Sequence, residues 1–270
     1  MMSDTPRIAV IGGGRMGEAI VAGLIAAGAA KAGDITVAEP DESRCAVFAA
    51  HGVSCVADGH DAVGTADIVI FAVKPQLIDA VVAHVADDVS QNAVVVSIAA
   101  GISCARIESL LSAGTAVVRV MPNTPAMVGE GMSVLSGGTE TTAGQLAAVR
   151  VLFESLGKAI VLDERYQDAA TAISGSGPAY VALFIDALAR AGVRHGLTRD
   201  VAQLLAMQTL RGTVELLERT GKHPEELVDA VSSPGGTTIA AIEALEAGGM
   251  RASVSAAVAA AVKRSKELGS

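Results

Sequence analysis

Close to the start of the chain stands Ile8-Ala9-Val10-Ile11-Gly12-Gly13-Gly14-Arg15-Met16-Gly17, the strongest indication of the fold. Four apolar residues predict a buried strand, and they run directly into the spacing G-x-G-x-x-G at residues 12–17. In such a turn Gly12 permits the sharp bend, Gly14 lets a ligand approach the backbone, and Gly17 lets the following helix close on the strand. The N-terminus of that helix offers its unpaired N–H groups to phosphates. The stretch therefore predicts a strand, turn and helix that bind the pyrophosphate of a dinucleotide.

Short apolar runs alternate with helical segments through the first part of the chain. Runs rich in β-branched residues predict buried strands at residues 7–11, 35–38, 67–73, 94–98 and 117–121. Between them lie helix start signals, among them Asp41, Pro75 and Ser103. This alternation is typical of the α/β class with a doubly wound, Rossmann-type parallel sheet.

After Glu164 the strand pattern ends, and the residues predict five successive helices. They are expected at residues 178–191, 198–220, 225–231, 237–247 and 251–267. We therefore expect two domains, a dinucleotide-binding domain at residues 1–163 and an all-α domain at residues 164–270.

Two of these predicted helices are apolar on nearly every side. Residues 179–188 contain Asp186 as their one charged residue, so a helix there must be buried on nearly all sides. The same holds for residues 252–262. A run of about ten residues is too short to cross a membrane, and a domain of roughly a hundred residues has little interior in which to bury two such helices. We infer that this half of the chain packs against a second copy of itself.

The composition of the 270 residues excludes several classes of protein. A hydrophobic share of 51% with 18% charged residues excludes a disordered chain. A net charge of −9 and 2% aromatic residues argue against nucleic-acid binding, which needs basic surfaces and stacking platforms. No apolar run reaches the roughly 20 residues of a membrane span, and the first residues do not form a secretory signal. We expect a cytoplasmic protein that binds neither nucleic acid nor membrane.

The three cysteines, Cys45, Cys55 and Cys104, are odd in number and lack C-x-x-C spacing. This pattern indicates neither a disulfide framework nor a zinc site. We expect three small, buried, apolar side chains and no bound metal.

Glu39 ends the second predicted strand, 22 residues beyond Gly17. At this place an acidic side chain accepts hydrogen bonds from the ribose 2′-OH of NAD and repels the 2′-phosphate of NADP. Arg44 follows about one helical turn later. It could reach a phosphate, although a solvated helix face is the simpler interpretation. The preference between the two nicotinamide cofactors stays open.

Three further strands end in residues that could line a ligand, because ligands of open parallel sheets bind beyond the carboxyl ends of the strands. Ala72-Val73-Lys74-Pro75 contains the one lysine between Lys31 and Lys158, and a surface lysine explains it equally well. The stretch Ile98-Ala99-Ala100-Gly101 brings small residues that let a flat ring approach the backbone. The stretch Met121-Pro122-Asn123-Thr124-Pro125 holds one amide between two prolines, which is equally consistent with a rigid turn.

Two loops rich in Gly and Ser open helices in the second half. Ser174-Gly175-Ser176-Gly177-Pro178 puts Pro at a first helical position, and Ser232-Ser233-Pro234-Gly235-Gly236-Thr237-Thr238 precedes another helix. Hydroxyl groups and bare N–H groups at a helix N-terminus can bind a carboxylate. Taken alone, each loop is first of all a helix cap.

The second half lacks an evident general acid or base. No lysine lies between Ala159 and Gly221, and His195 and His223 fall at a helix end and next to a proline. Dehydrogenases that act on hydroxyl groups must move a proton, usually with Lys or His. A reductase without such a group suits a substrate that is already electrophilic, such as a protonated imine.

Over essentially its whole length the chain resembles the pyrroline-5-carboxylate reductase family. The specific motif is Leu227-Val228-Asp229-Ala230-Val231-Ser232-Ser233-Pro234-Gly235-Gly236-Thr237-Thr238-Ile239, which has the pattern of the family's signature. The other matching motifs, shared with wider NAD(P)-linked groups, are residues 12–17, 72–75, 99–101, 123–125 and 174–180.

The resemblance implies hydride transfer from NADPH or NADH to the C=N bond of 1-pyrroline-5-carboxylate, which gives L-proline in the last step of proline biosynthesis. It also implies a nucleotide-binding domain followed by a helical domain that forms an intertwined homodimer, with dimers that often assemble into rings. It leaves open the cofactor preference, the oligomer size beyond the dimer, the activity on six-membered ring analogues and feedback inhibition by proline.

The resemblance also implies roles for residues by position. The cofactor-binding residues would be Ile11, Gly12, Gly13, Gly14, Arg15 and Met16 at the pyrophosphate, Glu39 at the ribose, and Ala72, Val73, Lys74, Pro75, Ile98 and Ala100 along the cofactor. The substrate-binding residues would be Glu164, Ser233, Gly236, Thr237 and Thr238. Of these, Ser233, Gly236 and Thr237 would hold the carboxylate, and the Thr238 hydroxyl would act as the catalytic group at the ring nitrogen.

Two departures from the family pattern concern the cofactor. Glu39 stands where relatives that use NADPH often carry a small polar residue, Asn or Arg, and Ala230 replaces an Asn that contacts cofactor in some members. Two other functions share part of this pattern. A hydroxyacid dehydrogenase or imine reductase would show a lysine-bearing helix in the second half, which this chain lacks. A non-catalytic dinucleotide sensor would not require the Ser/Thr loop, and it would bind NAD(P)H without oxidising it.

Overall fold

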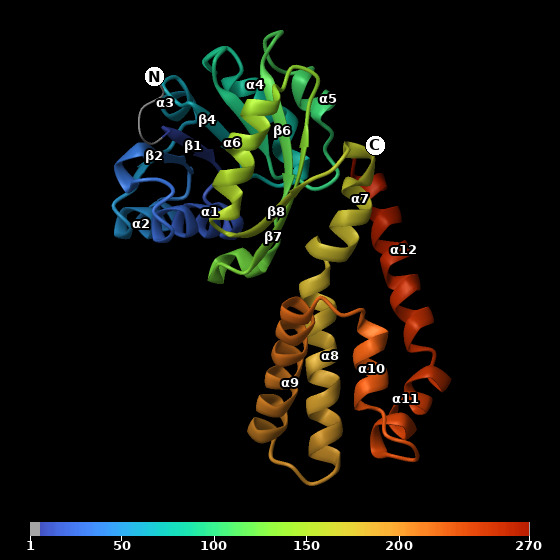
Figure 1. Ribbon diagram of the computed structural model, residues 1–270. Coiled ribbons are helices and arrows are strands. Elements are labelled where there is room, and N and C mark those ends of the chain that lie inside the picture. Colours follow the sequence, from blue (N-terminus) through green and yellow to red (C-terminus); the bar gives the residue numbers. More distant parts are fainter. Residues whose placement is uncertain (1–5, 270) are drawn as a thin grey trace. The chain divides into compact units, whose positions relative to one another are not determined.

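The computed structural model describes residues 6–269 and falls into two compact units (Figure 1). The sheet unit comprises the chain up to Ser176 together with the segment from Ala261 onward. The helical unit comprises Gly177–Ala260.

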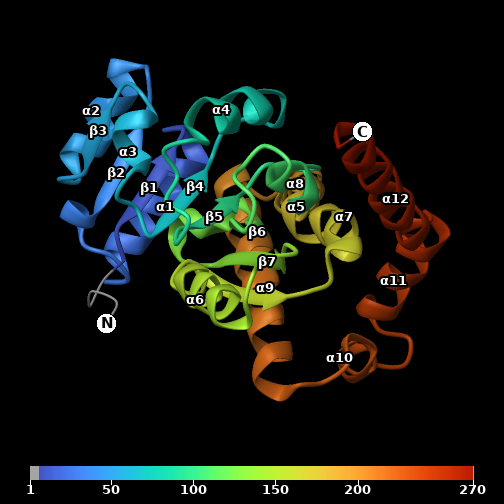
Figure 2. The same cartoon turned by 90° about the horizontal axis from the view of Figure 1, so that it is seen from above.

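Eight strands form one sheet in the described part of the sheet unit, in the order β3-β2-β1-β4-β5-β6-β7-β8. In Figure 2 the reader can follow this order from β3 and β2, through β1 and β4, to β7. The strands are β1 (Ile8–Ile11), β2 (Ile35–Ala38), β3 (Ser54–Val56), β4 (Ile68–Phe71), β5 (Val94–Ser97), β6 (Ala116–Met121), β7 (Gly131–Gly137) and β8 (Gly157–Val161). The predicted doubly wound α/β architecture is confirmed.

Helices cover both faces of this sheet. They are α1 (Arg15–Ala26), α2 (Glu42–Ala50), α3 (His60–Val63), α4 (Ile78–Val85), α5 (Cys104–Glu108), α6 (Ala143–Glu154) and α7 (Gln167–Ala170). Because side chains alternate along a strand, Ile8 and Val10 of β1 enter one apolar layer, which they share with α1 and α6. Ala9 and Ile11 enter the other layer, which they share with α3, α4 and α5. Burial on both faces explains why the central strands are apolar at nearly every position.

The five predicted strands are present, but β3, β7 and β8 were not predicted. The strand β3 is only three residues long, and β7 contains Ser133 and Ser136, which are buried polar residues that interrupt the apolar pattern. The direction of β7 also departs from a purely parallel sheet, because β7 runs antiparallel to β6. A short connection through the 3-10 turn Thr124–Val128 permits only this direction, since a parallel neighbour needs a long crossover.

The expectation for the cysteines is wrong at two positions. Cys45 of α2 and Cys55 of β3 form a disulfide with their Cα atoms 5.5 Å apart, whereas Cys104 is buried and free. The two cysteines are ten residues apart in the sequence, and they can pair because β3 packs against α2. Without that strand the two cysteines could not be placed together. Burial raises the pKa of the Cys104 thiol to about 12, and the nearby Glu164 carboxylate adds to this effect.

The helical unit contains α8 (Gly177–Arg194), α9 (Arg199–Thr220), α10 (Pro224–Val231), α11 (Thr237–Ala247) and the first part of α12 (Met250–Leu268). All five helices predicted in the second half are therefore present. The helices α8 and α9 pack closely, since a Cβ on Gly192 would lie 3.0 Å from the Cβ of Ala202. Within the described residues of this unit the buried side chains are Ala189, Ala202 and Ala206.

Large apolar side chains of the helical unit are exposed in a single chain. Leu183 of α8 is 71% exposed and Leu204 of α9 is 63% exposed. Three alanines cannot supply the interior of a stable unit, because small domains already bury too little apolar surface. Exposed apolar faces of this kind support the inference of a second copy.

The stretch Glu164–Arg194 is long and apolar enough, by length and composition, to cross a membrane. It begins inside the sheet unit with the 3-10 turn Glu164–Tyr166 and the short helix α7, followed by a π-helical turn at Thr171–Gly175. Gln167 of α7 is fully buried, and its amide donates to the carbonyl of Val134 at 3.1 Å. A segment anchored by hydrogen bonds in a sheet is poorly suited to a lipid environment.

Candidate active site

The strand order places the predicted phosphate turn at the switch point of the sheet. From β1 the chain proceeds to β2 on one side, and β4 follows on the other side. The turn is tied to both neighbours, because the N–H of Gly12 donates to Ala38 O (2.9 Å) and the N–H of Ala72 donates to Ile11 O (2.8 Å). Ligands of doubly wound sheets bind beyond the carboxyl ends of the strands at this point.

The three glycines of the fingerprint have different geometries. Gly12 has a φ of +108°, and a Cβ there would lie 2.8 Å from Ala72 O. A Cβ on Gly17 would lie 2.3 Å from Gly12 O, so only glycine lets α1 approach the turn this closely. Gly14 has no atom within 4 Å of its missing side chain, and it is the N-cap of α1 without a side-chain hydrogen bond. The helix N-terminus therefore faces open space beside a closely packed turn, which fits a pyrophosphate.

Glu39 lies directly against the glycine turn. Its carboxylate accepts hydrogen bonds from the N–H of Gly13 at 2.7 Å and from the N–H of Asp41 at 3.1 Å. This fixes a negative charge at the end of β2, where an adenosine ribose is predicted.

Arg44 is not the solvated residue that the sequence suggested. Its guanidinium donates to Gly13 O at 2.8 and 2.7 Å and pairs with Glu18 of α1 at 2.7 Å. The α2 helix brings this side chain back to the turn, an approach that spacing along the chain does not reveal. Arg44 thus holds the outer side of the glycine turn.

The end of β4 lies beside this turn, and the end of β5 lies next to that of β4. The N–H of Ile98 donates to Phe71 O at 3.1 Å, which brings the two strand ends together. Ala72, Val73, Ile98 and Ala100 are half-buried there, while Lys74 is exposed. Lys74 precedes the 3-10 turn Pro75–Leu77, as expected for a lysine at the rim.

Asn123 has a structural role in this unit. Its side-chain amide donates to Ser174 O at 3.0 Å, and its oxygen accepts from the N–H of Met132 at 2.8 Å. Both ends of the amide are used to hold the chain, which supports the interpretation as a rigid turn.

Glu164 belongs to a polar cluster in the sheet unit. Its carboxylate accepts from the N–H of Cys104 at 2.8 Å and from the guanidinium of Arg119 at 3.3 Å. The Arg119 side chain is 7% exposed and also lies 3.8 Å from Asp168, whose carboxylate accepts from Ser265 at 2.7 Å. A substrate contact by Glu164 stays a prediction, and the geometry adds a role in holding Arg119.

Arg119 is not among the residues singled out from the sequence, although the sequence contains a feature that points to it. It is the one charged residue within the apolar run of β6. A charged residue buried in a strand needs a partner, and Glu164 and Asp168 lie far from it in the sequence. One of its guanidinium nitrogens has no hydrogen-bond partner among the described residues.

The predicted carboxylate site in the helical unit is a tight turn followed by a helix. The residues Ser233-Pro234-Gly235-Gly236 form a β-turn in which the N–H of Gly236 donates to Ser233 O at 3.0 Å. Gly235 has a φ of +65°, the conformation of glycine at the third position of a type II turn after proline. Gly236 is the N-cap of α11 without a side-chain hydrogen bond, and Thr238 is half-buried in the first turn of that helix.

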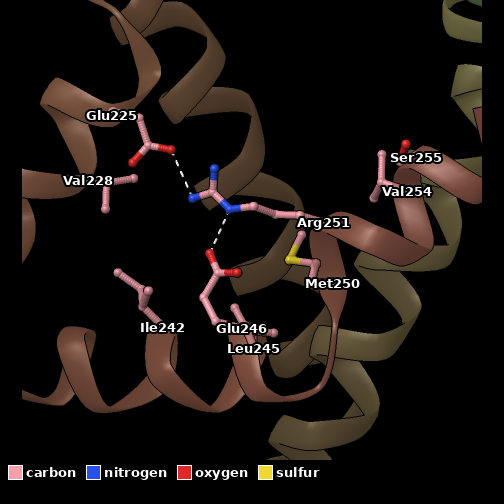
Figure 3. A pocket seen from close by; sticks show the side chains of 9 residues that line it. All are labelled: Glu225, Val228, Ile242, Leu245, Glu246, Met250, Arg251, Val254 and Ser255. Atoms are coloured by element: carbon pink, nitrogen blue, oxygen red, sulfur yellow. Dashed lines mark hydrogen bonds and ion pairs between the residues drawn. The ribbon is translucent and has the colours of Figure 1, made fainter.

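The helical unit also contains a pocket of about 480 Å³ between α10, α11 and α12 (Figure 3). Arg251 bridges Glu225 at 2.9 Å and Glu246 at 2.6 Å on one side of it. Val228, Ile242 and Leu245 supply apolar walls. None of the predicted substrate residues lines this pocket, so it is separate from the carboxylate site.

A doubly wound sheet with an open glycine turn at its switch point, followed by a helical unit, defines the class of NAD(P)-binding oxidoreductases. Comparisons with known proteins agree with this class. Residues 7–101 match the family described as NADP oxidoreductase, coenzyme F420-dependent. Residues 164–268 match the family described as pyrroline-5-carboxylate reductase dimerisation.

Several known proteins of the same name are similar to this chain over nearly its full length. A pyrroline-5-carboxylate reductase of Arabidopsis thaliana is 44% identical over 267 residues, covering 98% of this chain and 96% of the relative. The enzyme of that name from Corynebacterium melassecola is 45% identical over 266 residues, covering 97% of this chain and 98% of the relative. The crystal structure of the Plasmodium falciparum pyrroline carboxylate reductase with NADP bound has a TM-score of 0.90 at 30% identity, with both chains fully covered.

The chain belongs to the pyrroline-5-carboxylate reductase family. As a member it is an NAD(P)H-dependent oxidoreductase that acts on a CH–NH group. The resemblance seen in the sequence is thereby confirmed. The match of residues 164–268 also gives the exposed apolar helices a partner, a second copy of the chain in a homodimer.

Proposed function

We propose that the chain reduces 1-pyrroline-5-carboxylate to L-proline with NADPH or NADH. The observation that carries this proposal is the combination of two anion-binding helix ends in one chain. One is the N-terminus of α1 behind an open Gly14, and the other is the N-terminus of α11 behind the Ser233–Gly236 turn. The first suits a pyrophosphate and the second suits the carboxylate of a small acid.

The residues of the sheet unit fit a nicotinamide dinucleotide. The close contacts that a side chain would make at Gly12 and Gly17 show a turn shaped for glycine, and Gly14 leaves room for a ligand. The residues proposed to hold the cofactor are Ile11 through Met16, Glu39, Ala72 through Pro75, Ile98 and Ala100. The nicotinamide, when bound, supplies the hydride.

The residues of the helical unit are proposed to orient the substrate. The N–H groups of Gly236 and Thr237 and the hydroxyl of Ser233 would hold the carboxylate, aided by the helix dipole. The Thr238 hydroxyl, one residue further along α11, would hydrogen-bond the ring nitrogen and stabilise its proton. Holding donor and acceptor in contact can supply about 7–11 kcal/mol of the barrier, so the chain needs no strong general base.

Glu39 supports a preference for NADH in this chain. Its carboxylate is held at the end of β2 by Gly13, and the nearest arginine on α2, Arg44, is paired with Glu18 and the turn. A 2′-phosphate there would meet a fixed negative charge, whereas a 2′-OH could donate to it.

The finer organisation is part of the same proposal. Residues 1–163 would form the dinucleotide-binding domain, and residues 164–270 would form the substrate-binding and dimerisation domain, a boundary supported by the family match that begins at residue 164. The homodimer would be intertwined and could assemble into rings. A cytoplasmic location fits the enzyme class.

Steady-state rates test the proposal directly. The full-length enzyme is mixed with pyrroline-5-carboxylate and either nicotinamide, and oxidation is followed at the absorbance of the reduced cofactor. We expect turnover with L-proline as product. Tight NAD(P)H binding without turnover would favour the dinucleotide sensor instead. Turnover of hydroxyacids but not of pyrroline-5-carboxylate would favour the dehydrogenase alternative.

A further inference from the structure

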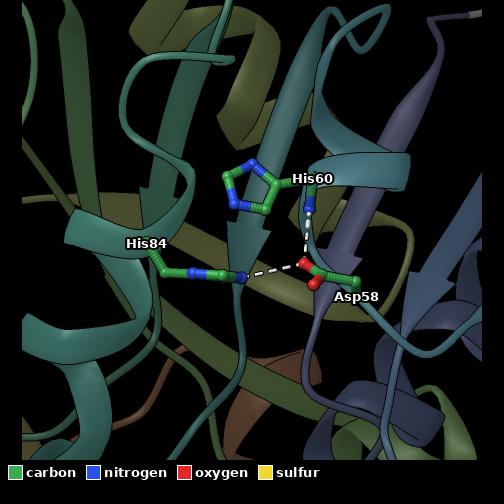
Figure 4. A group of neighbouring side chains, drawn as sticks. All are labelled: Asp58, His60 and His84. Atoms are coloured by element: carbon green, nitrogen blue, oxygen red, sulfur yellow. Dashed lines mark hydrogen bonds and ion pairs between the residues drawn. The ribbon is translucent and has the colours of Figure 1, made fainter.

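Asp58, His60 and His84 form an exposed cluster on the sheet unit, and none of the three is among the residues proposed to hold the cofactor (Figure 4). One ligand atom from each side chain lies within 4.8 Å of the other two. The two imidazole rings have their centroids 4.2 Å apart with an angle of 64° between the planes. The Nε2 atom of His84 lies 2.9 Å from Asp58 Oδ1.

Packing of the backbone brings these residues together. Asp58 lies in the turn after β3, His60 begins α3, and His84 lies in the last turn of α4. A Cβ on Gly59 would lie 2.7 Å from Val85 Cγ1, so the missing side chain lets the turn approach α4. The apolar layer beneath includes Val63 of α3 and Val82 of α4, both fully buried. The exposed cluster therefore stands on a rigid base.

A second carboxylate orients one of the imidazoles. Asp88 pairs with His60 Nδ1, which leaves Nε2 as the ring nitrogen available for a ligand bond. Metal-binding histidines almost always give their other ring N–H to a carboxylate or carbonyl in this way, which fixes the tautomer and raises ligand basicity. Asp58 is fixed as well, because its Oδ1 accepts from the backbone N–H of His60 at 3.1 Å.

We propose that Asp58, His60 and His84 bind a divalent transition-metal ion, with Asp88 as the outer carboxylate. Two imidazoles and one carboxylate suit Zn²⁺, Ni²⁺ or Cu²⁺, whereas Mg²⁺ prefers oxygen ligands and retained water. Ligand bonds of about 2.0–2.2 Å need donor atoms roughly 3.3 Å apart, which exposed side chains can reach by small rotations. Water would complete the coordination.

We expect the bound ion to link the two short helices α3 and α4. The site follows β3, whose Val56 carbonyl accepts from the N–H of Glu39 at 2.9 Å, so it lies at the same edge of the sheet as the glycine turn. An ion held by α3, α4 and the turn between β3 and α3 would stabilise this edge without taking part in hydride transfer.

Calorimetric titration tests the proposal on the full chain after removal of metals with a chelator and without reductant, so that Cys45 and Cys55 stay paired. Zn²⁺ is the probe and Mg²⁺ is the comparison. We expect one Zn²⁺ per chain and no Mg²⁺ binding. The variant His84→Ala should weaken Zn²⁺ binding at least about 100-fold, and Asp88→Asn should weaken it about 10- to 100-fold. His51→Ala removes an exposed histidine outside the cluster and should leave binding unchanged.

Two further readouts do not depend on activity. Co²⁺ should give visible d–d absorption in the wild type that is lost in His60→Gln, and Zn²⁺ should raise the Tm of the wild type but not of His84→Ala. Circular dichroism confirms that the variants fold. The proposal is overturned if Zn²⁺ does not bind, or if it binds equally well to His84→Ala and the wild type.

Discussion

The carboxylate of Glu39 and the backbone N–H of Gly13 are joined by a hydrogen bond of 2.7 Å. This contact ties the acidic end of β2 to the turn that follows β1, across the seam where the two strands lie side by side. The charge of Glu39 is therefore held in place before any cofactor binds.

Replacing Glu39 by Gln is expected to shift the cofactor preference toward NADPH. The neutral amide removes the repulsion of a 2′-phosphate, and we expect the ratio of kcat/KM for NADPH over NADH to rise by about tenfold, which corresponds to about 1.4 kcal/mol. Glu42→Gln is the matched control, because it removes the same charge from an exposed position in α2. Equal ratios in the wild type and Glu39→Gln would contradict a role in selectivity.

Alanine substitutions at Gly17 and Gly14 should distinguish an effect on protein stability from an effect on cofactor binding. In Gly17→Ala the new Cβ would meet Gly12 O at 2.3 Å, so we expect a loss of roughly 1–3 kcal/mol in unfolding free energy together with weak cofactor binding. In Gly14→Ala the side chain meets open space, so the unfolding free energy should fall by less than about 1 kcal/mol, the cost of Ala in place of Gly at a helix N-cap. Cofactor affinity should still fall, because the methyl group enters the phosphate site. Thermal unfolding and fluorescence titration with NADH measure the two effects, and normal affinity in Gly14→Ala would count against that site.

The loop before α11 should divide into a binding part and a catalytic part. Thr238→Ala is expected to lower kcat/KM by about 10- to 100-fold, with partial rescue in Thr238→Ser, since the hydroxyl would act at the ring nitrogen. Ser233→Ala should mainly raise KM. Thr237→Ala keeps the backbone N–H and should behave like the wild type. Unchanged steady-state kinetics in Thr238→Ala would remove its hydroxyl from the mechanism.

A charge on the apolar face of α8 should prevent dimer formation. Leu183 is 71% exposed in the single chain. Burial of such a side chain in an interface stabilises the dimer by about 1.5–3 kcal/mol, and a symmetric dimer buries it twice. Sedimentation of Leu183→Asp should therefore show monomer at concentrations where the wild type is dimeric. Leu77→Asp places the same change on the sheet unit, where Leu77 is 52% exposed, and should stay dimeric. A dimeric Leu183→Asp would place the interface elsewhere.

The cysteines should differ in reactivity in a defined order. The native protein should react with no thiol reagent, because Cys45 and Cys55 are paired and the pKa of the buried Cys104 is raised to about 12. One thiol should react after unfolding, and three after unfolding with reduction. Cys45→Ser should lower the unfolding free energy by about 2–3 kcal/mol, as expected for a loop of this length. Three reactive thiols in the unfolded, unreduced protein would refute the disulfide.

Much of the fold could be predicted from local patterns. The apolar runs of β1, β2, β4, β5 and β6 are continuous because both faces of the sheet are covered, and the helices α8 through α12 follow from apolar spacing and clear end signals. The short edge strand β3 and the serine-containing β7 lack such a pattern, since their neighbours in the sheet determine their conformation.

Local sequence patterns were enough to predict the strand, turn and helix at residues 8–17, the change to helices in the second half, and the Ser/Thr loop at residues 232–238, because each depends on residues that are near neighbours in the chain. Four contacts could not be predicted in this way: Arg44 with the glycine turn, Cys45 with Cys55, Glu164 with the buried Arg119, and His60 with His84. Each of these contacts joins side chains from different elements, and no local periodicity sets the distance between elements. Packing of helices on the sheet sets that distance.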